Sequence, residues 1–222
     1  MMVASWWVVL IGLVSVVAVS PLLAGWSEAL AAGTVQRWWL PRATTGGRTW
    51  TVGALACVLT AGSVAARPYP AWVILAAVGA VLIVVDVRVH LLPGRLVYPA
   101  AAVITVVLAG VALFDGAGQD LLRAVTAAAA VGVFWLIVVF LAPAAMGLGD
   151  VRVLALAAGL LGWTSWSAVL YGQCLTFLLA ALIAVGLAVF TPQRRGRRMP
   201  VPMGPAIIVA TVIASWWGDR LM

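Results

Sequence analysis

The chain has little charge and contains no lysine. Only 9% of its 222 residues are charged and its mean hydropathy is +1.18. A soluble domain carries about 25% charged residues, and a chain this apolar cannot bury its surface in a soluble core. The net charge of +7 comes from arginines in short stretches between apolar runs, a pattern typical of topology determinants rather than of nucleic-acid binding. The composition therefore excludes a soluble globular protein and predicts an integral membrane protein.

Cysteine and histidine are also scarce. The two cysteines, Cys57 and Cys174, lie inside apolar runs, and there is a single histidine. No C-x-x-C or Cys/His spacing is present, so we expect no metal site, no disulfide scaffold and no cofactor. Cysteines in such positions are typically small buried residues of helices, and we interpret both in that way.

Eight apolar runs predict an all-α, polytopic membrane helix bundle with seven or eight transmembrane helices, each needing about 20 residues. We expect one integral membrane domain over residues 1–222. The predicted helices are 3–24, 50–66, 70–87, 96–114, 121–142, 151–163, 167–190 and 201–217. The sixth is too short to span alone, so it is either a half-helix or merges with its flanks. The first run lacks the basic start of a signal peptide, and we expect a retained helix.

The distribution of arginine predicts the orientation. With the N-terminus outside, ten of the 13 arginines fall in loops that face the cytoplasm, which is a clear positive-inside bias. The stretch 25–49, rich in tryptophan, then becomes a short cytoplasmic interfacial loop. We therefore expect a multi-pass protein of the cell membrane, in contact with membrane lipid and not with nucleic acid. Nothing in the sequence sets an oligomeric state.

Two aspartates stand at the ends of apolar segments, on the same predicted cytoplasmic side. Asp86 lies within Val85–Pro93 and Asp150 closes Met146–Asp150. An ionisable group in such surroundings is costly and marks a functional site. Two carboxylates that share a proton can activate water for peptide hydrolysis. The alternative is structural: Asp150 caps the sixth helix, and Asp86 is an interfacial residue paired with Arg88.

Glycine and proline shape both neighbourhoods. Pro93 and the glycine after it end the third helix, and Pro99 fits the first turn of the next one. Gly147 and Gly149 allow backbone conformations closed to other residues and let another chain approach closely. His90 lies near the first aspartate, and we interpret it as an interfacial loop histidine rather than a catalytic one.

Three motifs resemble those of the type IV prepilin peptidases. The stretch 86–93 resembles the D-x-R-x-x-x-[IL]-P segment of that family, and 147–152 resembles its G-x-G-D-[VIF]-[KR] motif. The stretch 200–205 is similar to the P-x-x-x-G-P sequence that opens the family's last helix. The motifs occur in the family's order and cover roughly residues 72–217, so we expect a peptidase core over 70–217.

The resemblance implies an intramembrane aspartic endopeptidase. Such enzymes remove the basic leader of type IV prepilins or pseudopilins at the cytoplasmic face, with Asp86 and Asp150 as the catalytic pair, one as general base and the other as acid. The implied partner is a prepilin or pseudopilin substrate. The other matched positions receive supporting roles in the motifs: Arg88, Pro93, Gly147, Gly149, Arg152, Gly204 and Pro205. The two arginines would hold local structure, bind lipid headgroups or tune the carboxylates.

The chain also departs from the family. Longer members carry a cytoplasmic domain with paired cysteines between the first two helices and methylate the new N-terminus with S-adenosylmethionine. The stretch 25–49 is too short for a folded domain and has no cysteine, so we expect a peptidase without methyltransferase activity.

Two alternatives remain open. Signal-peptide-peptidase and presenilin-like proteases also use G-x-G-D, but the sequence lacks the Tyr-Asp and Pro-Ala-Leu motifs that accompany it there. A transporter or channel could bind a proton or cation at the two aspartates, although such sites are typically near the bilayer midplane rather than at helix ends.

Overall fold

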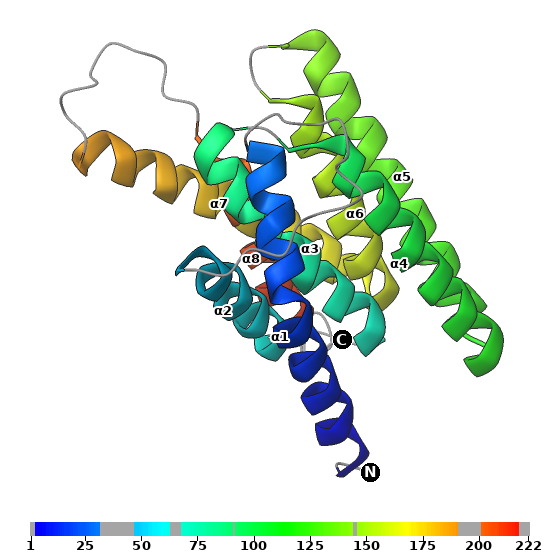
Figure 1. Cartoon of the computed structure of the whole chain (residues 1–222). Helices are drawn as coiled ribbons and strands as arrows, with labels where there is room; N and C mark the ends of the chain where they lie inside the picture. The colour runs from blue at the N-terminus through cyan, green and yellow to red at the C-terminus, as the bar shows by residue number, and fades with distance from the viewer. Residues whose placement is uncertain are drawn as a thin grey trace.

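The computed structural model describes residues 3–31, 47–62, 68–90, 92–143, 146–190 and 201–217. These ranges contain eight α-helices and no strand (Figure 1). The helices are α1 (Val3–Ala31), α2 (Gly47–Gly62), α3 (Tyr69–Val89), α4 (Gly94–Asp115), α5 (Gly118–Leu141), α6 (Leu148–Thr164), α7 (Trp166–Phe190) and α8 (Met203–Trp217). Five of them, α1, α3, α4, α5 and α7, are long and apolar enough to cross a membrane. The predicted all-α polytopic membrane fold is confirmed.

Helix α8 lies at the centre of the packing. It contacts α3 on one side and α6 on another, and it also packs along α7. Helix α1 packs on α2 and α3, while α5 packs along α6 (Figure 1). Both helices that carry a candidate aspartate, α3 and α6, therefore share α8 as a neighbour.

Small residues allow α5 and α6 to pack closely. A Cβ atom built on Gly162 of α6 would lie 2.6 Å from the Cβ of Ala127 on α5, and one on Gly159 would lie 3.3 Å from the Cβ of Ala128. Apolar burial alone does not hold helices together in a bilayer, so such close backbone approach supplies the packing energy. This interface fixes α6 against α5.

The sixth helix differs from the prediction. It runs over Leu148–Thr164, which is longer than 151–163, and it does not merge with its flanks. Gly147 is its N-cap. Ser165 has an extended conformation, with φ −166° and ψ 162°, and separates α6 from α7. The Ser165 hydroxyl accepts the backbone N–H of Ala168, so the same residue caps the start of α7. Asp150 consequently lies in the first turn of α6 and not at its N-cap.

The connection from α3 to α4 is short and defined by its caps. Helix α3 ends at Val89, and His90 adopts a left-handed conformation with φ 51° while its backbone N–H donates to the carbonyl oxygen of Asp86 at 2.8 Å. Pro93 is the N-cap of α4, which starts at Gly94 rather than at residue 96. Because α4 begins at Gly94, Pro99 lies inside the helix and not in its first turn, and that part of the prediction is wrong.

Two other expectations need correction. Helix α1 continues to Ala31, so the first part of the predicted interfacial loop 25–49 is helical; residues 32–46 and the arginine-rich stretch 194–198 lie outside the described residues. Cys57 is half-buried, but Cys174 is exposed on α7. An apolar thiol is tolerated on the outer face of a membrane helix, which is why its apolar context did not predict burial.

Candidate active site

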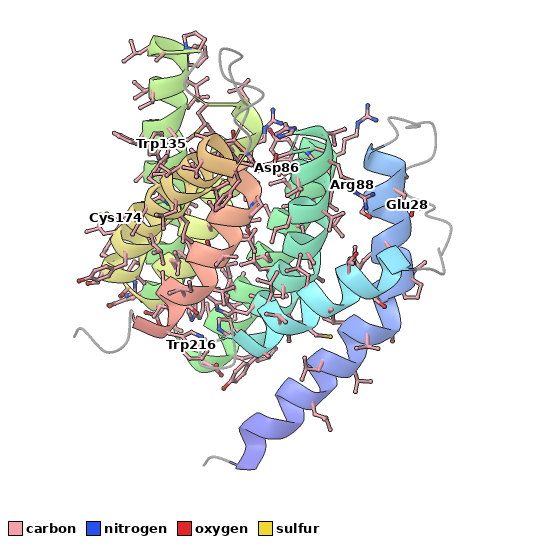
Figure 2. All side chains as sticks on the ribbon, turned by 90° about the vertical axis from the view of Figure 1, so that its left-hand side faces the viewer. Glu28, Asp86, Arg88, Trp135, Cys174 and Trp216 are labelled. Carbon is pink, nitrogen blue, oxygen red and sulfur yellow. The ribbon has the colours of Figure 1, made fainter. Side chains whose placement is uncertain are left out.

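Asp86 is buried in the last turn of α3, with 4% of its surface exposed. Figure 2 shows it at one end of the bundle, with Trp216 near the opposite end. Its Oδ2 atom accepts a hydrogen bond of 2.7 Å from the backbone N–H of Gly204, in the first turn of α8. First-turn N–H groups have no partner within their own helix, and the helix N-terminus carries partial positive charge. The start of α8 is therefore built to receive a carboxylate.

The close approach of Asp86 and α8 depends on glycine. A Cβ atom on Gly204 would lie 3.0 Å from the Oδ2 of Asp86 and 3.1 Å from its Cβ. Pro205, the next residue, has no N–H and so leaves no further donor unsatisfied at this position. At the point where Asp86 reaches α8, the glycine of the third motif thus supplies the donor and the proline beside it adds none.

Asp150 is held within its own helix turn. Its Oδ2 atom accepts the backbone N–H of Gly147 at 3.1 Å, which closes the N-terminal turn of α6. The structural alternative is therefore correct in part, because Asp150 does contribute to the helix cap, from the third position of the helix. This contact leaves its second carboxylate oxygen available for other partners.

The two aspartates lie at the same end of the bundle. A Cβ atom on Gly149 would lie 2.8 Å from the carbonyl oxygen of Leu92, so the glycine lets the start of α6 rest against the α3–α4 connection. Asp150 precedes the apolar part of α6, a helix that is not among the five spans. Burial raises its pKa to about 6, the Gly147 N–H lowers the pKa, and the nearby Asp86 carboxylate raises it. The two carboxyl groups therefore interact electrostatically, although they are 64 residues apart in sequence.

Neither candidate arginine binds an aspartate. Arg88 is exposed at the end of α3, and the guanidinium of Arg152 lies over the ring of Tyr98, 5.1 Å from its centroid. Among the described residues, no ion pair joins either arginine to Asp86 or Asp150. The alternative in which Asp86 pairs with Arg88 is therefore wrong, and Arg152 packs against the start of α4.

Sequence reasoning missed the part played by Arg123, which it used only to set the orientation. Its guanidinium donates to the carbonyl oxygens of Gly162 at 2.6 Å and Thr164 at 3.0 Å, and also to Asp120 at 2.7 Å. The carbonyl oxygens of Gly162 and Thr164 belong to the last turn of α6 and have no N–H partner within that helix. A cation is favoured at this end of a helix. Arg123 therefore anchors the far end of the helix whose first turn carries Asp150. The sequence shows only that Arg123 follows a short polar stretch between two apolar runs. That position does not reveal which helix end the arginine binds.

Within the described ranges, no group of three or more His, Cys, Asp or Glu side chains is arranged to hold a metal ion. The arrangement offers two interacting carboxyl groups and two backbone N–H donors. Acids that influence each other in this way titrate as a coupled pair.

Comparison with known proteins gives a consistent picture. The model of the type IV leader peptidase family matches residues 72–189. A prepilin leader peptidase/N-methyltransferase of Stutzerimonas stutzeri is 29% identical over 140 residues, which cover 62% of this chain and 46% of the relative. The protein of the same name from Pseudomonas aeruginosa is 33% identical over 91 residues, covering 40% and 29%. The chain thus aligns with less than half the length of these curated relatives, and no solved structure matches it. Because the family match covers more than half of the chain and includes both aspartates, the chain belongs to the type IV leader peptidase family.

Proposed function

We propose that the protein is an aspartic endopeptidase that removes the leader peptide of type IV prepilins or pseudopilins. The reaction takes place at the cytoplasmic face of the cell membrane, and Asp86 and Asp150 activate the attacking water. Family membership supports the class of substrate. The observation that supports the mechanism is that two carboxyl groups from different helices lie at one end of the bundle, near enough for Asp86 to influence the pKa of Asp150.

The contacts of the two aspartates suggest different roles. Asp86 receives the shorter hydrogen bond, 2.7 Å, from the positive end of α8, and this contact favours a carboxylate. Asp150 has a raised pKa of about 6 and so holds its proton more readily than an ordinary aspartate. We therefore assign Asp86 as the general base and Asp150 as the general acid.

The proposed reaction is a direct hydrolysis. Asp86 takes a proton from water as the water oxygen bonds to the scissile carbonyl carbon, and Asp150 donates its proton to the carbonyl oxygen. When the tetrahedral intermediate collapses, the C–N bond breaks and the proton on Asp86 passes to the leaving amine. The carbonyl oxygen returns its proton to Asp150, so both carboxyl groups regain their starting states and one water has been consumed.

The test is co-expression with a prepilin that carries a C-terminal tag, followed by mass spectrometry of the tagged product. Wild type is compared with Asp86→Asn and Asp150→Asn, which keep the side-chain size but remove the exchangeable proton. Asp115→Asn is the matched control, because Asp115 is exposed at the other end of α4. We expect wild type and the control to remove the leader, and each active-site variant to accumulate in the membrane without doing so.

Cleavage that survives either active-site substitution contradicts the mechanism. Prepilins left uncut by wild type contradict the proposed function and favour the transport alternative.

We also propose that the new N-terminus remains unmethylated. The support is the sequence between the first two helices, which has no cysteine and is short. The mass of the trimmed product tests this in the same experiment, because replacing a hydrogen of the N-terminal amine by a methyl group adds the mass of one CH2 group.

A further inference from the structure

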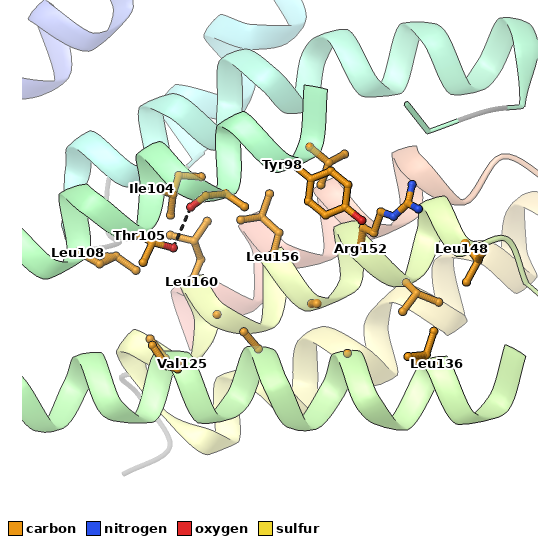
Figure 3. Close-up of a pocket in the computed structure, with 18 of the residues that line it drawn as sticks. Tyr98, Ile104, Thr105, Leu108, Val125, Leu136, Leu148, Arg152, Leu156 and Leu160 are labelled. Atoms are coloured by element: carbon orange, nitrogen blue, oxygen red, sulfur yellow. Dashed lines mark hydrogen bonds between the residues drawn. The ribbon is translucent and has the colours of Figure 1, made fainter. Parts of the chain in front are cut away.

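A cavity of about 730 Å³ lies between α4, α5 and α6 (Figure 3). Helix α6 forms its floor, while α4 and α5 form its two walls. The lining residues on α6 recur on one helix face from Leu148 to Leu160, so the cavity follows about 18 Å of that helix at 1.5 Å per residue. It is therefore an elongated groove that runs parallel to helices of the membrane bundle.

One end of the groove lies beside the candidate active site. Tyr98, Leu148 and Arg152 line that end, whereas Val125 and Leu160 line the other (Figure 3). Leu148 and Arg152 flank Asp150 in the first turns of α6. Asp150 itself does not line the groove, but it lies at the same level of α6 as the mouth, between Leu148 and Arg152.

The walls suit an apolar helix. Of the residues described around the groove, Arg152 alone carries a charge, and it lies at the mouth. The hydroxyl of Thr105 is already bound to the carbonyl oxygen of Ala101 at 2.8 Å, so it does not require a polar ligand. Small residues line the seam where the floor meets one wall, so no bulky side chain fills the groove there; these are Ala124, Ala128, Gly132, Ala155 and Gly159.

We propose that this groove binds the apolar helix of the prepilin substrate, with the cleavage point at the mouth and the helix running toward Val125 and Leu160. This inference rests on the proposed function, because a prepilin is cut just before its apolar helix. The groove begins at Leu148 in the first turn of α6, at the same level as Asp150, and its length of about 18 Å accommodates about 12 helical residues. The position of the scissile bond is then set by how the helix seats in the groove.

The test uses a photo-reactive residue placed in the groove. Benzoylphenylalanine is introduced at position 125 in the Asp86→Asn variant, which retains substrate, and a tagged prepilin is the probe. Position 133 is the matched control, because Val125 and Val133 are both valines of α5 with 51% and 57% exposure, and only Val125 lines the groove. We expect a cross-link from position 125 to the apolar segment of the prepilin, and none from position 133.

A second arm measures cleavage. We expect Val125→Trp, which fills the far end of the groove, to lower kcat/KM for the full prepilin by about tenfold or more. A shorter substrate, which ends about six residues after the cleavage point, should be cut at the wild-type rate, since it does not reach Val125. Val133→Trp should resemble wild type with both substrates.

The outcomes separate the groove from the activity. Equal cross-linking from both positions, or full activity of Val125→Trp on the full prepilin, overturns the groove proposal. Native mass spectrometry showing a phospholipid held by wild type and lost from a fully active Val125→Trp variant overturns it in favour of a lipid site. If wild type cuts no prepilin but position 125 still cross-links to it specifically, the proposed function fails and the groove stands.

Discussion

Replacing Gly204 by alanine tests whether α8 positions the carboxylate of Asp86. The added Cβ atom would lie 3.0 Å from Oδ2, 3.1 Å from Cβ and 3.3 Å from Cγ of Asp86. Rotation of the Asp86 side chain can move the carboxylate but not its Cβ atom. The contact between the two Cβ atoms can therefore be relieved only if α8 and α3 move apart.

The required movement gives the size of the effect. Carbon atoms pack at about 3.5–4.0 Å, so the helices must separate by about 0.4–0.9 Å. The N–H···Oδ2 distance of 2.7 Å would then become about 3.1–3.6 Å, at or beyond the usual limit of about 3.2 Å. A hydrogen bond to a charged group contributes about 1.5–3 kcal/mol. Its loss from the base corresponds to a decrease of about 10- to 100-fold in kcat/KM.

The assay is steady-state cleavage of a purified prepilin by detergent-solubilised enzyme, with two glycine-to-alanine controls. Gly79→Ala strains the same α3–α8 interface two turns away, where the new atom would lie 2.9 Å from Cγ2 of the buried Ile208 and meets no atom of Asp86. Gly110→Ala adds a methyl group on α4 with no atom within 4 Å. We expect Gly110→Ala to keep kcat/KM within about threefold of wild type, because nothing lies near the added methyl group. Gly79→Ala strains the packing of the two helices without touching Asp86, so we expect it to lose less activity than Gly204→Ala.

A Gly204→Ala enzyme with kcat/KM within threefold of wild type refutes the positioning argument. Equal losses in Gly204→Ala and Gly79→Ala refute it as well, because they would show that helix packing alone is being measured.

Three further predictions follow from the same contacts. Gly149→Ala places a Cβ atom 2.8 Å from the carbonyl oxygen of Leu92, a backbone atom that cannot rotate away, so cleavage should fall by about tenfold or more; Gly186→Ala on α7, with nothing within 4 Å, should cleave normally. Between pH 3.8 and about 6 the folded protein retains a proton on Asp150 that the unfolded chain loses, so the stability of wild type should fall as pH rises through this window and level off above it. Thermal unfolding measured across that range should show this component in wild type and not in Asp150→Asn. Arg123→Met leaves the C-terminal carbonyls of α6 without their donor and should destabilise the protein by about 1–3 kcal/mol in the same thermal assay, whereas a shift of zero would show that this contact has no net effect.

The sequence predicted the all-α membrane class well because hydropathy identifies the membrane helices. A membrane helix satisfies its backbone internally, so a long apolar run has one available structure whatever it packs against. Helix boundaries were less predictable. Pro99 could begin a helix or lie inside one, and the choice was made by the cap at Pro93, whose carbonyl oxygen accepts the N–H groups of Leu96 and Val97.

Contacts between distant residues were the part that the sequence did not reveal. The third motif drew attention to Gly204, but no local pattern indicates that its N–H donates to a carboxylate 118 residues earlier. Arg123 is a similar case, because its partners lie about 40 residues further along the chain. The groove between α4, α5 and α6 could not be foreseen either, since it depends on how three helices pack.

The two aspartates are positioned in physically different ways, and this difference gives the three motifs distinct tasks. Asp150 is held by Gly147 within one helix turn, so its placement is local and survives any arrangement that keeps α6 intact. Asp86 is held by the first turn of α8, so its placement depends on the packing of α3 against α8. The third motif is accordingly part of the site formed by the first and not a site of its own. It follows that changes in α8 act on Asp86, changes at Gly149 act on how closely Asp150 approaches it, and only the complete bundle brings the pair together.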